Sequence, residues 1–282
     1  MEQIVDSRKN KPLRHCAKRK KEKMSTIAIT NLDPIEIPHH FNLTHCPPTE
    51  FELSPRKTEK VSLPPHLGSI LADYDMATGS SPKSEALIRS RINVIILTTM
   101  AKMKREFVAQ LHTSTVSASS TVSSALLKSI HLKFERQIKF DWKSDNRLVK
   151  LSGIVDYSLS YGLPNKYGTN VAIIEAERPH FLKRGMLHCL AYMAMIHEKR
   201  KQSKVRDKSV YGIATDSYEW VFIRIRPNGE WIEKTYHWVH SAQDIVSMLV
   251  KIFAHAAGYN PQTMYKREYP ASSEQPATRT PK

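Results

Sequence analysis

The chain has 282 residues, of which 40% are hydrophobic, and it carries a formal net charge of +16 at pH 7. This length suits one large domain with tails or two small domains, with enough apolar side chains for a core. No run of ~18 apolar residues occurs and the N-terminus lacks an apolar signal core, so we expect neither a membrane span nor a secretory signal. The three scattered cysteines favour a reducing compartment over a disulfide framework.

The excess of positive charge predicts an anionic partner, and it is partly concentrated at the N-terminus. Residues 1–24 contain nine Lys or Arg and three acidic residues, a local net of +6. Nucleic acid is the partner that we expect, because phosphate contacts supply most non-specific nucleic-acid affinity. Acidic membrane surfaces or acidic proteins also fit this charge. A run of four cations predicts nuclear import or nucleic-acid binding, so we expect a nuclear location ahead of a cytoplasmic one. This run consists of Lys18, Arg19, Lys20 and Lys21.

Residues 1–82 are predicted to be largely disordered. They hold nine of the 16 prolines and show no sustained hydrophobic periodicity, although a short ordered piece at Leu67–Tyr74 could dock on a folded body. Residues 261–282 are rich in Ser, Thr and Pro and are predicted to form a disordered tail. The folded domain is therefore expected within residues 83–260.

That middle region alternates between helical and strand patterns. Ser84 before Glu85 and an apolar periodic run predicts a helix that extends to about Val108. Alternating apolar runs then predict three strands, a helix, a strand, a hairpin and a final helix, which together indicate an α/β fold. The expected elements are a short helix at 125–131, strands at 133–141, 148–160 and 170–177, a helix at 182–201, strands at 209–215, 218–226 and 231–236, and a helix at 242–257.

Acidic residues stand at the ends of two of these apolar runs. Asp156 belongs to one strand, and Glu175 and Glu177 end the next one. Carboxylates at neighbouring strand ends can converge on Mg²⁺, which prefers oxygen ligands and keeps some water. Such an ion can polarise a phosphate and activate a water molecule. The alternatives are a strand cap or a pair with a lysine for Asp156, a buried ion pair of Glu175 with Arg178 or a neighbouring lysine, and a solvent-facing strand end for Glu177.

The order and spacing of these segments resemble the PD-(D/E)xK nuclease superfamily. Gly153–Asp156 is similar to its G-x-x-D strand, Asn170–Glu177 to its acidic strand end, and Tyr211–Ser217 to the strand and turn that follow. More narrowly, the chain looks like the fungal nuclease-like domain proteins of unassigned role, over roughly Ser84–Gly258. The resemblance implies a restriction-endonuclease-like αβββαβ core, here with an added C-terminal hairpin and helix.

The resemblance also implies roles for the acidic residues. Asp156 and Glu175 would hold Mg²⁺ or Mn²⁺, with the backbone carbonyl of Ala176 as a third oxygen, for hydrolysis of DNA phosphodiester bonds. Glu177 stands where the family usually has a lysine that stabilises charge on the phosphate. A glutamate there can act as a base or as a further ligand. Whether the protein is an enzyme or carries a decayed site therefore depends on Glu177, which gives the variant pattern E-x-E.

Further contacts are expected from residues after the acidic strand. Arg178, Lys183 or Arg184 could supply positive charge to nucleic acid, and His188 with Tyr192 matches a Q-x-x-x-Y helix pattern of some relatives, with His in place of Gln. The alternative for the last two is packing on an amphipathic helix.

Three functions therefore stay open from the sequence. The first is a metal-dependent nuclease. The second is a decayed nuclease fold that serves as a nuclear nucleic-acid-binding or effector-like interaction module. The third is a protein-binding module with acidic partners. Glu106 and Glu135 could add a carboxylate to the site, although surface ion pairing is their more common fate.

Overall fold

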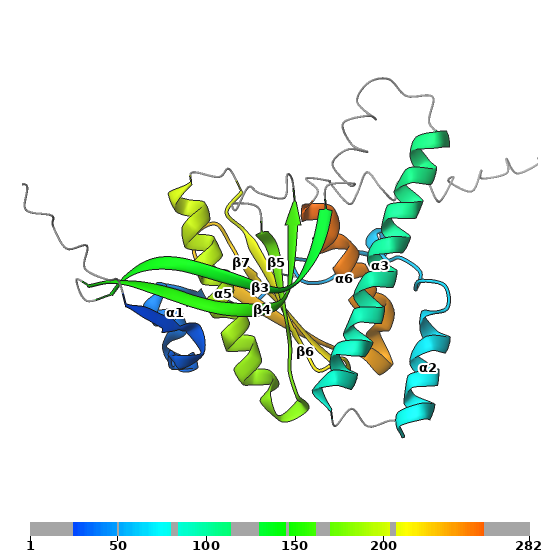
Figure 1. Ribbon diagram of the computed structural model, residues 1–282. Coiled ribbons are helices and arrows are strands. Elements are labelled where there is room, and N and C mark those ends of the chain that lie inside the picture. The colour runs from blue at the N-terminus through cyan, green and yellow to red at the C-terminus, as the bar shows by residue number, and fades with distance from the viewer. Residues whose placement is uncertain are drawn as a thin grey trace, which may run out of the picture.

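The computed structural model describes residues 25–49, 51–79, 84–113, 130–144, 147–161, 170–203 and 207–256. Within these ranges the chain forms a mixed sheet of eight strands and five α-helices, which confirms the α/β class (Figure 1). The strands are β1 (Thr26–Ala28), β2 (Thr44–His45), β3 (Ile130–Ser144), β4 (Arg147–Tyr161), β5 (Asn170–Ala176), β6 (Val210–Thr215), β7 (Glu219–Ile225) and β8 (Glu230–His237). The helices are α1 (Ile37–His40), α2 (Leu67–Thr78), α3 (Glu85–Thr113), α5 (Leu182–Gln202) and α6 (Trp238–Ala256).

The elements from α3 onward follow the predicted order. Ser84 caps α3 as expected, because its side-chain oxygen accepts a hydrogen bond from the backbone N–H of Leu87 at 3.3 Å. The short helix expected at 125–131 is wrong at its end, where β3 already begins at Ile130, and its other residues lie outside the described ranges. Helix α6 begins at Trp238, earlier than predicted, across a non-helical residue at Ser241.

The sheet has the order β1-β4-β5-β6-β7-β8-β2, with β3 paired to β4. Strands β5 and β6 are parallel, and α5 makes the crossover that a parallel pair requires. The long antiparallel β3–β4 hairpin reaches across the molecule in Figure 1. Helices α2, α3 and α6 cover one face of the sheet, and α5 with α1 covers the other.

Strand β5 is apolar along its length because both of its faces are buried. Ala172 and Ile174 pack with the core that contains α3 and α6, while Ile173 packs with the core that contains α5. Alternate residues of a strand point to opposite faces, so a continuous apolar run fits a strand between two helical layers. Glu175 follows this run and is still buried near the end of β5, while Glu177 just after the strand is half-buried.

The prediction that residues 1–82 are largely disordered is wrong for the described part of this region. Strand β1 pairs in parallel with β4, and β2 pairs in parallel with β8, so this segment supplies the first and the last strand of the sheet order. Ile29, Ile37 and Leu53 are fully buried. Each short piece contributes only a few apolar side chains, which is why no periodicity marks the region in the sequence. Helix α2 agrees with the ordered piece that we expected near Leu67.

Side-chain contacts fasten this N-terminal region to the sheet. Glu52 accepts hydrogen bonds from Arg224 at 3.2 Å and from Arg226 at 2.9 Å, and the bond from Arg226 is the main cause that lowers the pKa of Glu52 to about 2. The hydroxyl of Tyr236 donates to the carbonyl of Leu53 at 2.8 Å. Glu52 of the N-terminal region therefore pairs with two arginines, one in β7 and one just after it.

Two predicted regions lie outside the described residues. They are the basic run from Lys18 to Lys21 and the tail at 261–282. Across the described ranges, no helix combines the length and apolar composition needed to cross a membrane.

Gly153 in β4 is required by close packing against α5. A Cβ atom at this position would lie 2.3 Å from the hydroxyl oxygen of Tyr192 and 2.7 Å from a methyl carbon of Ile29. We expect Gly153→Ala to lower the free energy of unfolding by about 1–3 kcal/mol, because overpacking displaces both neighbours. Urea denaturation measures this loss.

Gly68→Ala is the matched control for this change. Gly68 lies in α2 and an added Cβ would meet nothing within 4 Å, so its replacement should cost no stability. Equal stability of the two variants would show that the contact between Gly153 and Tyr192 does not constrain the fold.

Candidate functional site

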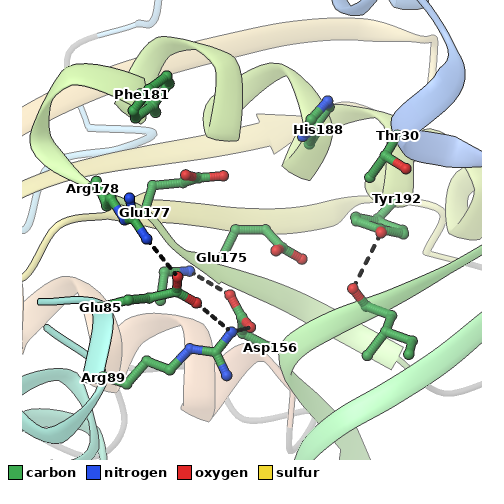
Figure 2. Close-up of a pocket in the computed structure, with 12 residues that line it drawn as sticks. Thr30, Glu85, Arg89, Asp156, Glu175, Glu177, Arg178, Phe181, His188 and Tyr192 are labelled. Atoms are coloured by element: carbon green, nitrogen blue, oxygen red, sulfur yellow. Dashed lines mark hydrogen bonds and ion pairs between the residues drawn. The ribbon is translucent and has the colours of Figure 1, made fainter.

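A cavity of about 370 Å³ opens where β4 and β5 meet the start of α3 and the first half of α5. Figure 2 shows its acidic side chains gathered on one wall, with His188 and Tyr192 on the helix opposite. Polar and charged groups predominate in the lining. The lining residues are Thr30, Glu85, Arg89, Ile154, Asp156, Glu175, Ala176, Glu177, Arg178, Phe181, His188 and Tyr192.

Asp156 on β4 is bound at both of its carboxyl oxygens. Oδ2 accepts the backbone N–H of Ala176 at 2.8 Å, which ties β4 to the end of β5. Oδ1 accepts a hydrogen bond from Nη2 of Arg89 at 2.6 Å. Burial raises the pKa of Asp156, although both of these partners favour its charged form. The structure thus joins Asp156 to the acidic strand end of β5, as the motif order predicts.

Glu175 is the most enclosed acid of the cavity, with 9% of its surface exposed. Its Oε1 atom is buried and has no hydrogen-bond partner in the described part of the chain. Burial raises the pKa of Glu175 well above its ordinary value, and the nearby Asp156 and Glu177 raise it further. The alternative of an ion pair with Arg178 is wrong, because Arg178 pairs with Glu85 at 3.8 Å instead. A buried carboxyl oxygen without a partner is a costly feature for structure alone.

Glu177 also belongs to the cavity and is half-buried rather than a solvent-facing strand end. Its side chain lies against Gly185 of α5, where an added Cβ would be 2.1 Å from Glu177 Cγ. Burial is the main cause that raises the pKa of Glu177, followed by the charges of Asp156 and Glu85. Gly185 therefore makes room for the side chain of Glu177.

The sequence did not reveal two members of the site, Glu85 and Arg89 on α3. Arg89 contacts Asp156 and lies 3.1 Å from Glu85 and 3.3 Å from Glu135. Glu85 also pairs with Arg178. The spacing of Glu85 and Arg89, four residues apart in a helix, is the one signal in the sequence, and it predicts their mutual contact. It does not show that α3 begins beside the end of β5.

Of the α5 residues predicted to contact nucleic acid, Tyr192 and His188 line this cavity and Lys183 does not. Tyr192 lines the cavity and donates its hydroxyl hydrogen to the carbonyl of Ile154 at 3.2 Å. His188 also lines it, and its buried Nε2 has no hydrogen-bond partner among the described residues. Burial, aided by the charge of Arg184, lowers the pKa of His188, so its ring is neutral at pH 7. Lys183 is not among the lining residues and lines a separate cavity with Glu219 and Glu233, so its contact with nucleic acid stays a prediction.

Arg184 stands close enough to Glu177 and His188 to affect the pKa of each, and its side chain is exposed. Of the two further acids considered, Glu106 pairs with Lys102 on α3 at 2.7 Å and is not among the lining residues. Glu135 is exposed on β3 and reaches the site only through its contact with Arg89.

The donor atoms offered by the site suit a hard cation. Asp156, in the middle part of β4, and Glu175, near the end of β5, provide carboxyl oxygens, one of which lacks a hydrogen-bond partner among the described residues. In the described ranges, no group of three or more His, Cys, Asp or Glu side chains is arranged to hold a metal ion. Mg²⁺ does not require such a group, because it commonly binds one or two carboxylates and takes its other ligands from water and substrate phosphates. The residues present therefore fit Mg²⁺ or Mn²⁺.

Comparison with known proteins gives this chain no assigned relative. No protein-family model matches it, and no curated protein matches its sequence. The functional conclusion therefore depends on the residues and their geometry.

Proposed function

We propose that the protein is a metal-dependent nuclease that hydrolyses DNA phosphodiester bonds. The observation that carries the proposal is the buried Glu175 carboxyl beside Asp156 in an open, polar cavity, whose Oε1 has no hydrogen-bond partner within the described ranges. The order α3, β3, β4, β5, α5, β6 supports a restriction-endonuclease-like αβββαβ core, with β7, β8 and α6 as the added hairpin and helix. The net charge of +16 supports a polyanionic substrate.

The charge of the cavity supports a role for a divalent cation. Among the described residues that line it are four carboxyl groups and two guanidinium groups, a formal excess of two negative charges. This excess contrasts with the basic chain around it. The acids repel one another in a partly buried space, and a divalent cation would offset that repulsion.

Asp156 and Glu175 would hold Mg²⁺, with the carbonyl of Ala176 as a further oxygen ligand. The bound ion would polarise the scissile phosphate and lower the pKa of a water molecule. Glu177 lies beside these ligands and would accept a proton from the attacking water, a role that suits a carboxyl with a raised pKa. Arg178 and Arg184 are exposed beside the cavity and would contact substrate phosphates.

A second candidate is a decayed nuclease fold that binds nucleic acid without cleaving it. The observation that favours it is Glu177, because a glutamate supplies no positive charge to the phosphate in the usual lysine position. In either case Lys18, Arg19, Lys20 and Lys21 would serve nuclear import or add phosphate contacts.

Cleavage of supercoiled plasmid DNA tests the proposal. The purified full-length protein is expected to nick or linearise plasmid in Mg²⁺ or Mn²⁺ and to be inactive in EDTA. The Asp156→Asn variant should be inactive in all three conditions. Salt-sensitive DNA binding that persists in EDTA, without cleavage in either metal, would instead establish the decayed fold. Cleavage that survives Asp156→Asn would refute the assignment of the site.

A further inference from the structure

We propose that Arg89 is an internal cation that occupies Asp156 in the metal-free protein and leaves it when a divalent metal ion binds. This inference rests on the proposed metal site at Asp156 and Glu175. It assigns to α3 the control of metal entry, through a residue that the nuclease motifs do not contain.

The two oxygens of Asp156 have different kinds of partner. Oδ2 is bound to a backbone N–H, that of Ala176, which is fixed by the pairing of β5 with β6. Oδ1 is bound to the end of a long arginine side chain. The backbone contact orients the carboxylate permanently, whereas the arginine contact can be broken by side-chain rotation alone. Oδ1 is therefore the oxygen available for exchange between Arg89 and a metal ion.

Arg89 satisfies only part of the acidic group. It binds Asp156, but Oε1 of Glu175 has no hydrogen-bond partner in the described ranges. The Nε atom of Arg89 is likewise buried and without a partner in those ranges. The guanidinium contacts Asp156, Glu85 and Glu135 but not Glu175 Oε1, so buried polar atoms stay unsatisfied on both sides in the described part of the chain. A compact ion between Asp156 and Glu175 would bind both carboxylates.

Two other acids already contact Arg89 and would keep it after it leaves Asp156. Glu85 lies 3.1 Å from Nη2 and Glu135 lies 3.3 Å from Nη1, with side chains that are 45% and 72% exposed. The guanidinium thus keeps two anionic partners in a more hydrated position. The hydroxyl of Tyr157 donates to the backbone carbonyl of Arg89 at 3.4 Å and holds this part of α3 against β4. Arg89 would therefore leave Asp156 by rotation of its side chain, with its backbone in place. Figure 2 shows Arg89 entering from the α3 side, opposite His188 and Tyr192.

Mn²⁺ binding, measured by calorimetry on the full-length protein, tests the inference without any cleavage assay. Arg89→Met removes the competing cation and is expected to bind Mn²⁺ about tenfold more tightly than the wild type, equal to about 1.4 kcal/mol. Arg178→Met is the matched control, since Arg178 lines the same cavity and carries the same charge but pairs with Glu85 instead of Asp156. We expect its affinity to stay within about threefold of the wild type, as for an exposed charge.

A second measurement needs no loss of Arg89. In protein labelled with ¹⁵N-arginine, Mg²⁺ should shift the Nε–H signal of Arg89, which Arg89→Lys identifies. The signal of Arg91 should stay in place, because Arg91 is buried and pairs with Asp75. If the Nε–H signal of Arg89 does not shift when Mg²⁺ is added, the inference is overturned.

The calorimetric outcomes also separate the two proposals. The role of Arg89 would be overturned if Arg89→Met bound Mn²⁺ no more tightly than Arg178→Met does. It would also be overturned if Arg89→Met bound no Mn²⁺ at all. If the variants show the expected Mn²⁺ affinities but the protein cleaves no DNA, the proposed role of Arg89 stands and only the proposed nuclease activity is refuted.

Discussion

Replacing Glu175 with glutamine is expected to lower Mg²⁺-dependent DNA cleavage at least about 100-fold and, in EDTA at neutral pH, to stabilise the fold. Loss of one charged ligand weakens the charge stabilisation that such a site provides, which is commonly worth a factor of 10²–10³. The stability gain comes from the same burial. Glutamine has nearly the same shape but removes a carboxyl whose charged form is disfavoured by burial and by the neighbouring acids.

The sign of the pH dependence follows from the raised pKa of Glu175. The folded protein keeps the proton on this carboxyl at pH values where the unfolded chain, with an ordinary pKa of 4.5, has released it. The contribution of Glu175 to stability is therefore highest below pH 4.5 and falls as the pH rises towards the folded pKa. The glutamine variant lacks this fall, so its advantage should grow with pH to about 1–2 kcal/mol.

Urea denaturation from pH 5 to pH 8, with and without Mg²⁺, measures this behaviour. Mg²⁺ should stabilise the wild type, because the ion binds only the folded chain, and should have little effect on Glu175→Gln. Glu106→Gln is the control, since this exposed acid pairs with Lys102 and is not part of the cavity. A glutamine variant that is less stable than the wild type in EDTA would contradict the account of Glu175 as a buried acid whose charged form is costly in this cavity.

The sequence was sufficient to predict the parts of the site that belong to neighbouring strands. Asp156 and Glu175 end adjacent apolar runs, and the pairing of β4 with β5 brings them together. The α/β class follows from the same patterns, because β5 is apolar on both faces and α5 has an apolar stripe. Local periodicity carries this information within each segment.

The missing parts depend on contacts between distant segments. Arg89 precedes Asp156 by 67 residues, and no local pattern shows that the first turn of α3 meets the end of β5. The ordered pieces between Thr26 and Glu59 were missed for a related reason. Each makes a short edge pairing or buries a few side chains, and their stability comes from the sheet to which they attach.

Glu177→Lys is expected to reduce cleavage by about 10- to 100-fold, although it introduces the residue that PD-(D/E)xK nucleases commonly have at the position that Glu177 resembles. In this cavity Glu177 is the proposed proton acceptor, and general-base catalysis contributes about 10²–10⁴-fold. A lysine would also add a cation beside Asp156 and Glu85, whose charges already act on residue 177. It would then compete with the metal ion for the carboxylate that Arg89 occupies in the metal-free protein.

Plasmid cleavage by three variants distinguishes a working E-x-E site from a degraded one. Glu177→Gln keeps the shape of the side chain and removes its basicity, so it should lose activity without a change in Mn²⁺ affinity beyond about threefold. Gly185→Ala leaves Glu177 in the sequence but places a methyl group 2.1 Å from its Cγ, which should displace the carboxyl and lower cleavage as well. Higher activity in Glu177→Lys than in the wild type would mean that the glutamate marks a decayed nuclease. Activity lost in all three variants would mean that α5 has been fitted, through Gly185, to a glutamate that the reaction uses.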